Sequence, residues 1–355
     1  MKKILFSMAI VCLFMTSCNK KPVETTTVSG LLPSKFEYKT DNGYVNKLYV
    51  IKNAHGMEVT AINIGARIVS IAVPDKDGNP LNVVLGYDSI APYLQLGDYY
   101  GAIVGRYANR IANGTFELDR VTYRVRQNEG KNILHGGPRG FHTCYFTIDQ
   151  AAENQLICTY YSKDDEQGFP GNVDLTVTYS LTDDNALKID YQATSDKTTL
   201  INVSNHAYFN LSGAQSATFA EQSLYIDAAK YTPTTEDLIP TGEIAPVQGV
   251  LDFTSPRTID TEYQYDLNYV LNHPGDVSNL AGKLQSAITG IGMEIYTTEP
   301  GLQFYNDKKR IAFVLETQHF PDSPHYPNFP STILQKDSVF NSQTIYKFNV
   351  NSHAL

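Results

Sequence analysis

The segment from Ile311 to Pro330 places a carboxylate next to a rigid loop. The apolar run Ile311 to Leu315 has the β-branched and aromatic residues of a buried strand, and it ends at Glu316. The residues that follow include two histidines, one aspartate and four prolines, which cannot continue a sheet ladder. We therefore expect Glu316 at the end of a stiff strand, where it can act as a base. A solvated glutamate is the alternative from this segment alone.

Two histidines stand in surroundings that suit a binding site. The segment Thr199 to Leu211 is predicted to be a strand, and it carries His206 and Tyr208 among asparagines. His135 ends another short strand directly before two glycines, which let a ligand approach the backbone closely. Polar groups at this density are costly to bury unless they are paired. They form either a satisfied polar network or a binding surface, and His135 alone could be a hydrogen-bonded turn residue.

Four more polar residues occur in segments that are otherwise apolar or rich in small residues. Asn109 and Arg110 follow a glycine-rich stretch, Asp266 stands among tyrosines, and Gln303 lies in a predicted strand. A monosaccharide needs such a set, because carboxylates, amides and guanidinium groups bind hydroxyls while aromatic rings cover the C–H faces. The candidate site residues are Asn109, Arg110, His135, His206, Tyr208, Asp266, Gln303 and Glu316.

The motifs that contain these residues resemble those of the aldose 1-epimerase (galactose mutarotase) family. In chain order they are Gly-Arg-Tyr-Ala-Asn-Arg-Ile-Ala-Asn-Gly, Leu-His-Gly-Gly, Asn-His-Ala-Tyr-Phe-Asn-Leu, Pro-Gly-Leu-Gln-Phe-Tyr and Glu-Thr-Gln-His-Phe-Pro-Asp. The resemblance implies a large antiparallel β-sandwich, with Glu316 as general base and His206 as general acid. It also implies that the substrate is bound by Asn109, Arg110, His135, Asp266 and Gln303, with Tyr208 as a neighbour.

These residue types are sufficient to interconvert α- and β-aldoses. Glu316 would take the proton of the C1 hydroxyl while protonated His206 donates to the ring oxygen. The C1–C2 bond then rotates in the open aldehyde, and the ring closes on the other face. We expect no metal and no other cofactor, and an aldose such as glucose or galactose as the partner. Three short segments differ from the usual family residues (141–145, 325–326 and 335–337), which leaves the preferred sugar open.

Other functions share part of this residue set. A glycoside hydrolase would use two carboxylates about 5 to 9.5 Å apart; Asp266 and Glu316 could form that pair, but the histidines would then have no role. His319, Asp322 and His325 could bind a metal, although the prolines between them favour a structural loop. A non-catalytic carbohydrate-binding lipoprotein and an epimerase of a phosphorylated hexose are the remaining alternatives. The latter should carry more Lys or Arg at the site than the one arginine identified.

Strands must position these side chains, because segments of helical period are almost absent. The clearest hairpin joins Val173–Leu181 to Ala186–Ala193, where apolar and polar residues alternate. A second hairpin is expected over Thr115–Val125, and a short helix is expected over Ser89–Leu96. We therefore predict one all-β domain, a large antiparallel β-sandwich, over residues 36–355.

The N-terminus is predicted to be a lipoprotein signal. Two lysines precede an apolar run, Ile4 to Met15, that is too short to span a bilayer comfortably, and small residues precede Cys18. We expect residues 1–17 to be a signal peptide, Cys18 to be acylated, and residues 18–35 to form a tether. The protein would then be exported and held at a bacterial membrane by this anchor alone. An ordinary signal peptide or an uncleaved anchor is the alternative.

The composition argues against one class of partner and bears on whether the cysteines form a disulfide. The 355 residues carry a net charge of -9, which argues against nucleic acid, because phosphate binding requires concentrated Lys and Arg. Cys144 and Cys158 flank a predicted hairpin. An exported compartment permits a disulfide between them, but cross-strand disulfides are geometrically demanding, so two free thiols are favoured.

Overall fold

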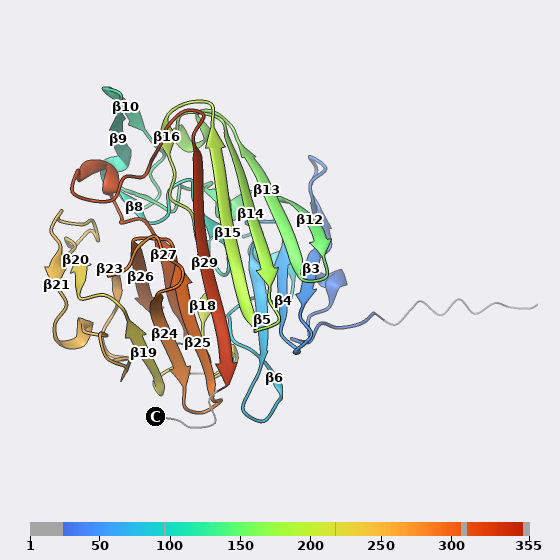
Figure 1. Ribbon diagram of the computed structural model, residues 1–355. Helices are drawn as coiled ribbons and strands as arrows, with labels where there is room; N and C mark the ends of the chain where they lie inside the picture. Colours follow the sequence, from blue (N-terminus) through green and yellow to red (C-terminus); the bar gives the residue numbers. More distant parts are fainter. Residues whose placement is uncertain (1–23, 96, 217, 307–310, 351–355) are drawn as a thin grey trace, which may run out of the picture.

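The computed structural model describes residues 24–350 except 96, 217 and 307–310 (Figure 1). Within these ranges the regular structure is almost entirely antiparallel β-sheet, and α1 (Ile90–Tyr93) is the one α-helix. The predicted all-β fold is therefore confirmed. No helix among the described residues is long and apolar enough to cross a membrane.

The largest sheet has nine strands, which run side by side across the molecule in Figure 1. Its central hairpin, β14 and β15, shows the predicted alternation: Val177 is paired with Tyr191 and Tyr179 with Ile189, and all four are buried. In spatial order the strands are β12 (Thr147–Ala152), β13 (Gln155–Ser162), β14 (Val173–Leu181), β15 (Ala186–Ser195), β29 (Val339–Val350), β25 (Ile291–Thr297), β24 (Leu280–Ser286), β19 (Gln222–Ile226) and β22 (Arg257–Thr258).

Two smaller sheets pack against one face of the large sheet. The six-stranded sheet, in spatial order, consists of β18 (Tyr208–Phe209), β27 (Phe313–Gln318), β26 (Gly301–Asn306), β23 (Asp266–Val270), β20 (Lys230–Thr232) and β21 (Ala245–Pro246). The four-stranded sheet consists of β3 (Leu48–Lys52), β4 (Glu58–Ile62), β5 (Ile68–Pro74) and β6 (Pro80–Asn82). One buried apolar cluster contains residues of all three sheets, such as Val59, Val177 and Phe304, and this shared core makes the fold a sandwich.

Short strand pairs and turns connect these layers. The pairs are β1 (Tyr38–Lys39) with β2 (Val45–Asn46), β9 (Thr115–Leu118) with β10 (Val121–Arg124), β8 (Arg110–Ile111) with β11 (Ile133–Leu134), β7 (Ile103–Val104) with β17 (Ser204–Asn205), and β16 (Thr199–Leu200) with β28 (Ile333–Leu334). The 3₁₀ helices are η1 (Pro33–Phe36), η2 (Ala112–Gly114), η3 (Phe141–Thr143), η4 (Glu166–Gly168), η5 (Gly249–Leu251) and η6 (Ser323–His325). The pairing of β9 with β10 confirms the hairpin predicted over Thr115–Val125.

Two local predictions are tested by the structure, and a third falls outside it. The helix expected over Ser89–Leu96 is only four residues long, and Ser89, although extended as an N-cap, makes no side-chain capping bond. Cys144 and Cys158 are free thiols, as favoured. Cys18 and residues 1–23 lie outside the described residues.

The described part of the predicted tether contacts the domain. The backbone N–H of Val28 donates to the buried carboxylate of Glu58 at 2.7 Å, and Thr27 is itself buried. Leu31 packs against the small apolar cluster that contains Phe36 and Tyr93. Ordered contacts with the domain therefore begin ahead of residue 36.

The segment Thr199 to Leu211, predicted as one strand, is divided among β16, β17 and β18, which pair with three different partners. Its asparagine side chains explain the interruptions, because they bond backbone groups that a continuous ladder would use. Asn202 bonds the backbone of Ala108 and His319, and Asn205 donates to the carbonyl of Gly101. The segment therefore contacts three separate elements, and His206, between β17 and β18, is buried.

Candidate active site

The six-stranded sheet has one apolar face and one polar face. Phe209, Phe304 and Leu315 point into the shared core. Side chains alternate along a strand and directly paired residues share a face, so the pairings Tyr208–Val314–Tyr305–Asp266 and Glu316–Gln303 place these residues on the opposite face. The site is therefore built on the polar face of a sheet whose other face is held by the core.

Glu316 lies within β27, because the strand continues to Gln318. The prediction that Glu316 ends its strand is therefore wrong by two residues. The ladder persists because Gly301 and Leu302 of β26 pair with Gln318 and Thr317. A carboxylate inside a central strand is held more rigidly than one at a strand end, and Glu316 is only 2% exposed.

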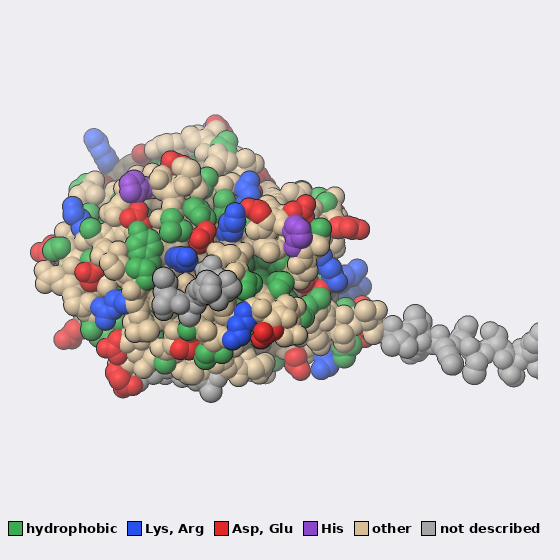
Figure 2. Space-filling view, turned by 60° about the horizontal axis from the view of Figure 1, so that its bottom comes forward, with side chains coloured by type: hydrophobic (Ala, Val, Ile, Leu, Met, Phe, Trp, Pro, Cys, Tyr) green, Lys and Arg blue, Asp and Glu red, His purple; other side chains and the backbone are tan. Residues whose placement is uncertain are grey.

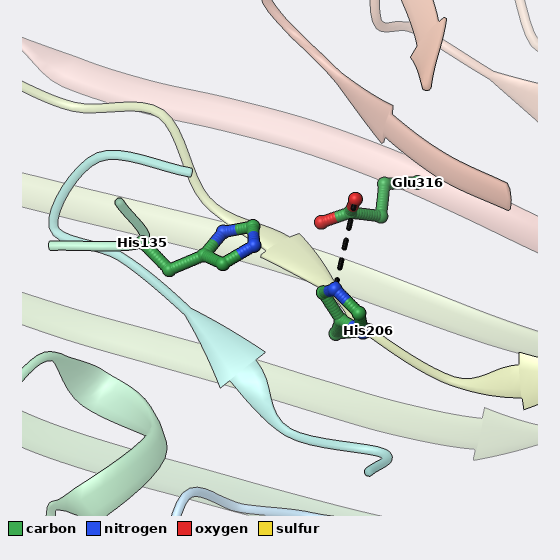
Figure 3. A group of neighbouring side chains, drawn as sticks. All are labelled: His135, His206 and Glu316. Atoms are coloured by element: carbon green, nitrogen blue, oxygen red, sulfur yellow. Dashed lines mark ion pairs between the residues drawn. The ribbon is translucent and has the colours of Figure 1, made fainter. Parts of the chain in front are cut away.

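His206 faces Glu316 from the link between β17 and β18. Its backbone N–H donates to the carbonyl of Ala102 at 2.8 Å, which fixes its place beside β7. The Nε2 atom of His206 lies 3.9 Å from Oε2 of Glu316, and Figure 3 shows the two side chains together with His135. Oε1 of Glu316 and Nδ1 of His206 are both buried without a hydrogen-bond partner. The pair is therefore close but not bonded, and it has unused polar atoms.

His135 and Asn109 hold each other at the ends of β11 and β8. The N–H of His135 donates to the Asn109 carbonyl at 3.0 Å, and the N–H of Asn109 donates to Nδ1 of His135 at 3.1 Å. Both residues have left-handed backbone angles, φ 49° for His135 and φ 61° for Asn109. Since Nδ1 accepts a hydrogen bond, neutral His135 carries its proton on Nε2. His135 is thereby fixed as a hydrogen-bond donor through Nε2.

A cavity of about 250 Å³ brings the predicted residues together. Gln303 donates to Oδ1 of Asp266 at 2.6 Å and so supports the site through that carboxylate. The lining consists of Tyr99, Asn109, Arg110, Glu129, Leu134, His135, His206, Tyr208, Leu238, Asp266, Tyr305 and Glu316.

Several lining residues were not predicted. Tyr99 lies between the histidines, with its ring 4.7 Å from that of His135 and 5.4 Å from that of His206. Glu129 makes a two-pronged salt bridge with Arg110, at 2.6 Å to Nε and 2.9 Å to Nη2. In the sequence Glu129 stands in a polar turn that is typical of a solvated loop, and nothing near it signals a contact with Arg110.

Burial sets the protonation of the central pair. It raises the pKa of Glu316 to about 8, with the nearby Asp266 carboxylate acting in the same direction and Arg110 against it. Burial lowers the pKa of His206 to about 3. The sequence predicts the opposite order, in which a free glutamate titrates well below a free histidine. Around neutral pH the pair holds one proton, and that proton is on Glu316.

The groups with metal-ligand character divide into two sets. The histidines of the 319–325 loop are engaged separately: His319 pairs with Glu299 and His325 with Asp322, both at 2.6 Å. They form no common cluster, in keeping with the structural loop expected there. His135, His206 and Glu316 have ligand atoms within 4.8 Å of one another. A cation there would need the Nε2 position of His135, which the bond from Asn109 keeps protonated.

The fold and the site together define a class of protein. A cavity in which a carboxyl of β27 faces an imidazole of the β17–β18 link suits acid–base chemistry on a small hydroxylated molecule. The view in Figure 2 shows acidic and basic side chains interspersed, with no continuous basic surface on that face.

Comparison with known proteins identifies the family. The sequence model described as aldose 1-epimerase matches residues 47–347. Galactose mutarotase of Sus scrofa is 35% identical over 92% of this chain and 98% of its own length. Aldose 1-epimerase of Escherichia coli K12 is also 35% identical, over 86% of this chain and 96% of its own. The structure of an aldose epimerase homologue from C. elegans superposes with a TM-score of 0.81 at 27% identity, over 86% of this chain and 99% of that one.

The chain belongs to the aldose 1-epimerase family. It is an isomerase that interconverts the α- and β-anomers of aldoses. The galactose mutarotase-like sandwich expected from the sequence is confirmed.

Proposed function

We propose that Glu316 and His206 open and close the ring of neutral aldohexoses such as glucose and galactose. The observation that carries this assignment is the buried pair itself, with 3.9 Å between the two groups and an unpartnered oxygen on Glu316. A pair at this distance has space for the reacting end of a sugar to bond both groups. The roles are those expected: Glu316 receives the C1 hydroxyl proton and His206 donates to the ring oxygen.

Sugar binding should create the reactive protonation state. A C1 hydroxyl that donates to Glu316 favours the carboxylate, and a ring oxygen that accepts from His206 favours the imidazolium. Both bonds act against the burial that places the proton on Glu316 in the free protein. The total of one proton on the pair does not change, so no exchange with solvent is required before ring opening.

The surrounding residues supply binding groups. Nε2–H of His135 donates to a hydroxyl, and the Asp266 carboxylate accepts from one, with Gln303 keeping that carboxylate in place. Arg110 and Asn109 lie on the same wall. The rings of Tyr99 and Tyr208 offer apolar surfaces to the C–H faces of the sugar. The list of binding residues is thus the predicted one with Tyr99 added.

Polarimetry tests the assignment. Freshly dissolved α-D-glucose and α-D-galactose should change rotation faster with the protein than in buffer, in proportion to enzyme concentration. A wild-type protein that binds these sugars in calorimetry without accelerating mutarotation would instead be a carbohydrate-binding lipoprotein. Acceleration confined to hexose phosphates would identify an epimerase of phosphorylated hexoses.

We also propose that the enzyme is exported and lipid-anchored through Cys18. The support is the basic start, the short apolar run and the small residues before Cys18, followed by a polar segment. Several acyl chains together hold a protein at a membrane far more firmly than one. Wild-type protein should fractionate with membranes and Cys18→Ser should be released. Membrane association of Cys18→Ser equal to that of wild type would refute the anchor.

A further inference from the structure

Arg110, which lines the cavity, and Lys131, which stands on the loop of Glu129, are each paired with a carboxylate. Arg110 is the only Lys or Arg among the lining residues that the structure describes, and Glu129 occupies its Nε and Nη2 atoms. Asp266 approaches the same Nη2 atom at 3.5 Å. Lys131, on the same loop as Glu129, pairs with Asp237 at 2.8 Å. Within the described part of the chain, the cavity therefore has no cation that lacks a carboxylate partner.

The charges of the described lining residues disfavour an anion. Two carboxylates, Glu129 and Asp266, stand against one guanidinium, even with Glu316 protonated. A bidentate guanidinium–carboxylate contact is the arrangement that a ligand carboxylate or phosphate would itself seek. Glu129 already fills that position, and its side chain is 37% exposed, so it stands at the solvent side of the buried Arg110. An anionic sugar would have to displace it or meet two like charges.

Resting on the proposed function, we propose that Glu129 is a specificity-determining residue that reserves the cavity for uncharged aldoses. It acts through Arg110, by occupying with its own carboxylate the site where a carboxylate or phosphate on the substrate would bind. Specificity of this kind depends on repulsion of the wrong ligand as well as attraction of the right one. Removal of the Glu129 charge should convert Arg110 into an anion receptor.

A matched pair of sugars makes the proposal measurable. D-galactose and D-galacturonate share ring configuration and differ at C6, where the second carries a carboxylate. Wild-type enzyme should have a low ratio of kcat/KM for galacturonate over galactose. Glu129→Gln keeps the size of the side chain and removes its charge, and it should raise this ratio on the order of tenfold, the value of one charge-assisted contact. The gain should shrink at high salt, since the freed guanidinium is near solvent.

The control is Asp237→Asn, which frees Lys131 in the neighbouring salt bridge and replaces no lining residue. Its ratio should equal that of wild type. An unchanged ratio in Glu129→Gln, or an equal rise in Asp237→Asn, would overturn the proposal.

Calorimetry with the two sugars keeps the test decisive if Glu129→Gln turns over neither of them. The proposal then requires that the substitution strengthen galacturonate binding relative to galactose binding. The absence of such a relative gain would refute the proposal. Failure of wild type to mutarotate galactose would count against the proposed function, while the binding comparison would still test Glu129.

Discussion

Two histidine–glutamate pairs in the described part of the molecule differ in geometry and in electrostatics, and each has a buried carboxylate. His319 and Glu299 are bonded at 2.6 Å, and this carboxylate raises the pKa of His319 against the effect of burial. His206 and Glu316 are 3.9 Å apart, and burial lowers the pKa of the histidine and raises that of the glutamate. The bonded pair uses its charges for structure. The separated pair lacks a direct bond, and its unpartnered polar atoms are available to the proposed substrate.

Replacing the histidine in each pair should separate these roles most strongly. His206→Asn removes the acid and should reduce turnover by roughly a hundredfold to ten-thousandfold. His319→Asn should leave turnover within a few-fold of wild type but cost about 3 kcal/mol of unfolding free energy, because it leaves Glu299 buried without its partner. Polarimetry and urea denaturation measure the two effects. Similar losses of turnover in both variants would remove the distinction between the pairs.

Replacement of Arg110, a proposed binding residue, should reduce activity less than replacement of the proposed acid or base. Arg110→Ala removes a side chain that is only 7% exposed and whose guanidinium contacts both Glu129 and Asp266. Charge-assisted hydrogen bonds contribute roughly 1.5 to 3 kcal/mol, so kcat/KM for galactose should fall about tenfold to a hundredfold. Circular dichroism should show an unchanged fold. Wild-type kinetics in this variant would place Arg110 outside the site.

The pH dependence of stability should also distinguish Glu316 from Glu299, with a smaller effect. The pKa of Glu316 is raised in the folded protein. The contribution of this carboxyl to stability is therefore complete below about pH 4.5 and is lost as the pH rises through about 8. At pH 9, Glu316→Gln should therefore unfold at a higher urea concentration than wild type, with an unfolding free energy larger by up to roughly 4 kcal/mol. At pH 4 the substitution should give no such gain in stability. Glu299→Gln should destabilise the protein at neutral pH. Equal pH dependence of stability in wild type and Glu316→Gln would contradict the raised pKa.

The pH profile of turnover should follow the shared proton. The pair loses its only proton as pH rises through about 8, which removes the acid, and gains a second as pH falls through about 3, which removes the base. Activity should therefore be flat across neutral pH and decline above about pH 8. A decline centred near pH 6.5, as for a free histidine, would show that His206 titrates independently.

The sequence could indicate the chemistry because the proposed site residues differ in type from their surroundings. Glu316, His206 and Asp266 interrupt apolar strands, and such interruptions are visible without coordinates. The order of the two pKa values could not be predicted, because it depends on burial produced by strands far apart in the chain. Glu129 could not be found either: it meets Arg110 from 19 residues away through the pairing of β8 with β11, and its own segment is an ordinary polar turn.

The strand boundaries show the same limit. The alternating pattern of β14 and β15 predicts their register, because one face is in the core and the other is not. The segment from Thr199 to Leu211 has apolar residues suited to a strand, but its asparagines bond the backbone of other elements and divide it. Side-chain bonds to distant backbone groups leave no periodic signal in a sequence.

The most direct test of the Glu316–His206 assignment is the initial mutarotation rate of α-D-galactose with Glu316→Gln, measured by polarimetry at saturating sugar. Gln keeps the shape of the side chain but cannot accept the C1 proton, so turnover should fall by orders of magnitude while calorimetric affinity stays within a few-fold of wild type. Addition of His206→Asn should cause little further loss, since residues that act as a unit are not additive. Near-normal turnover in Glu316→Gln would contradict the assignment.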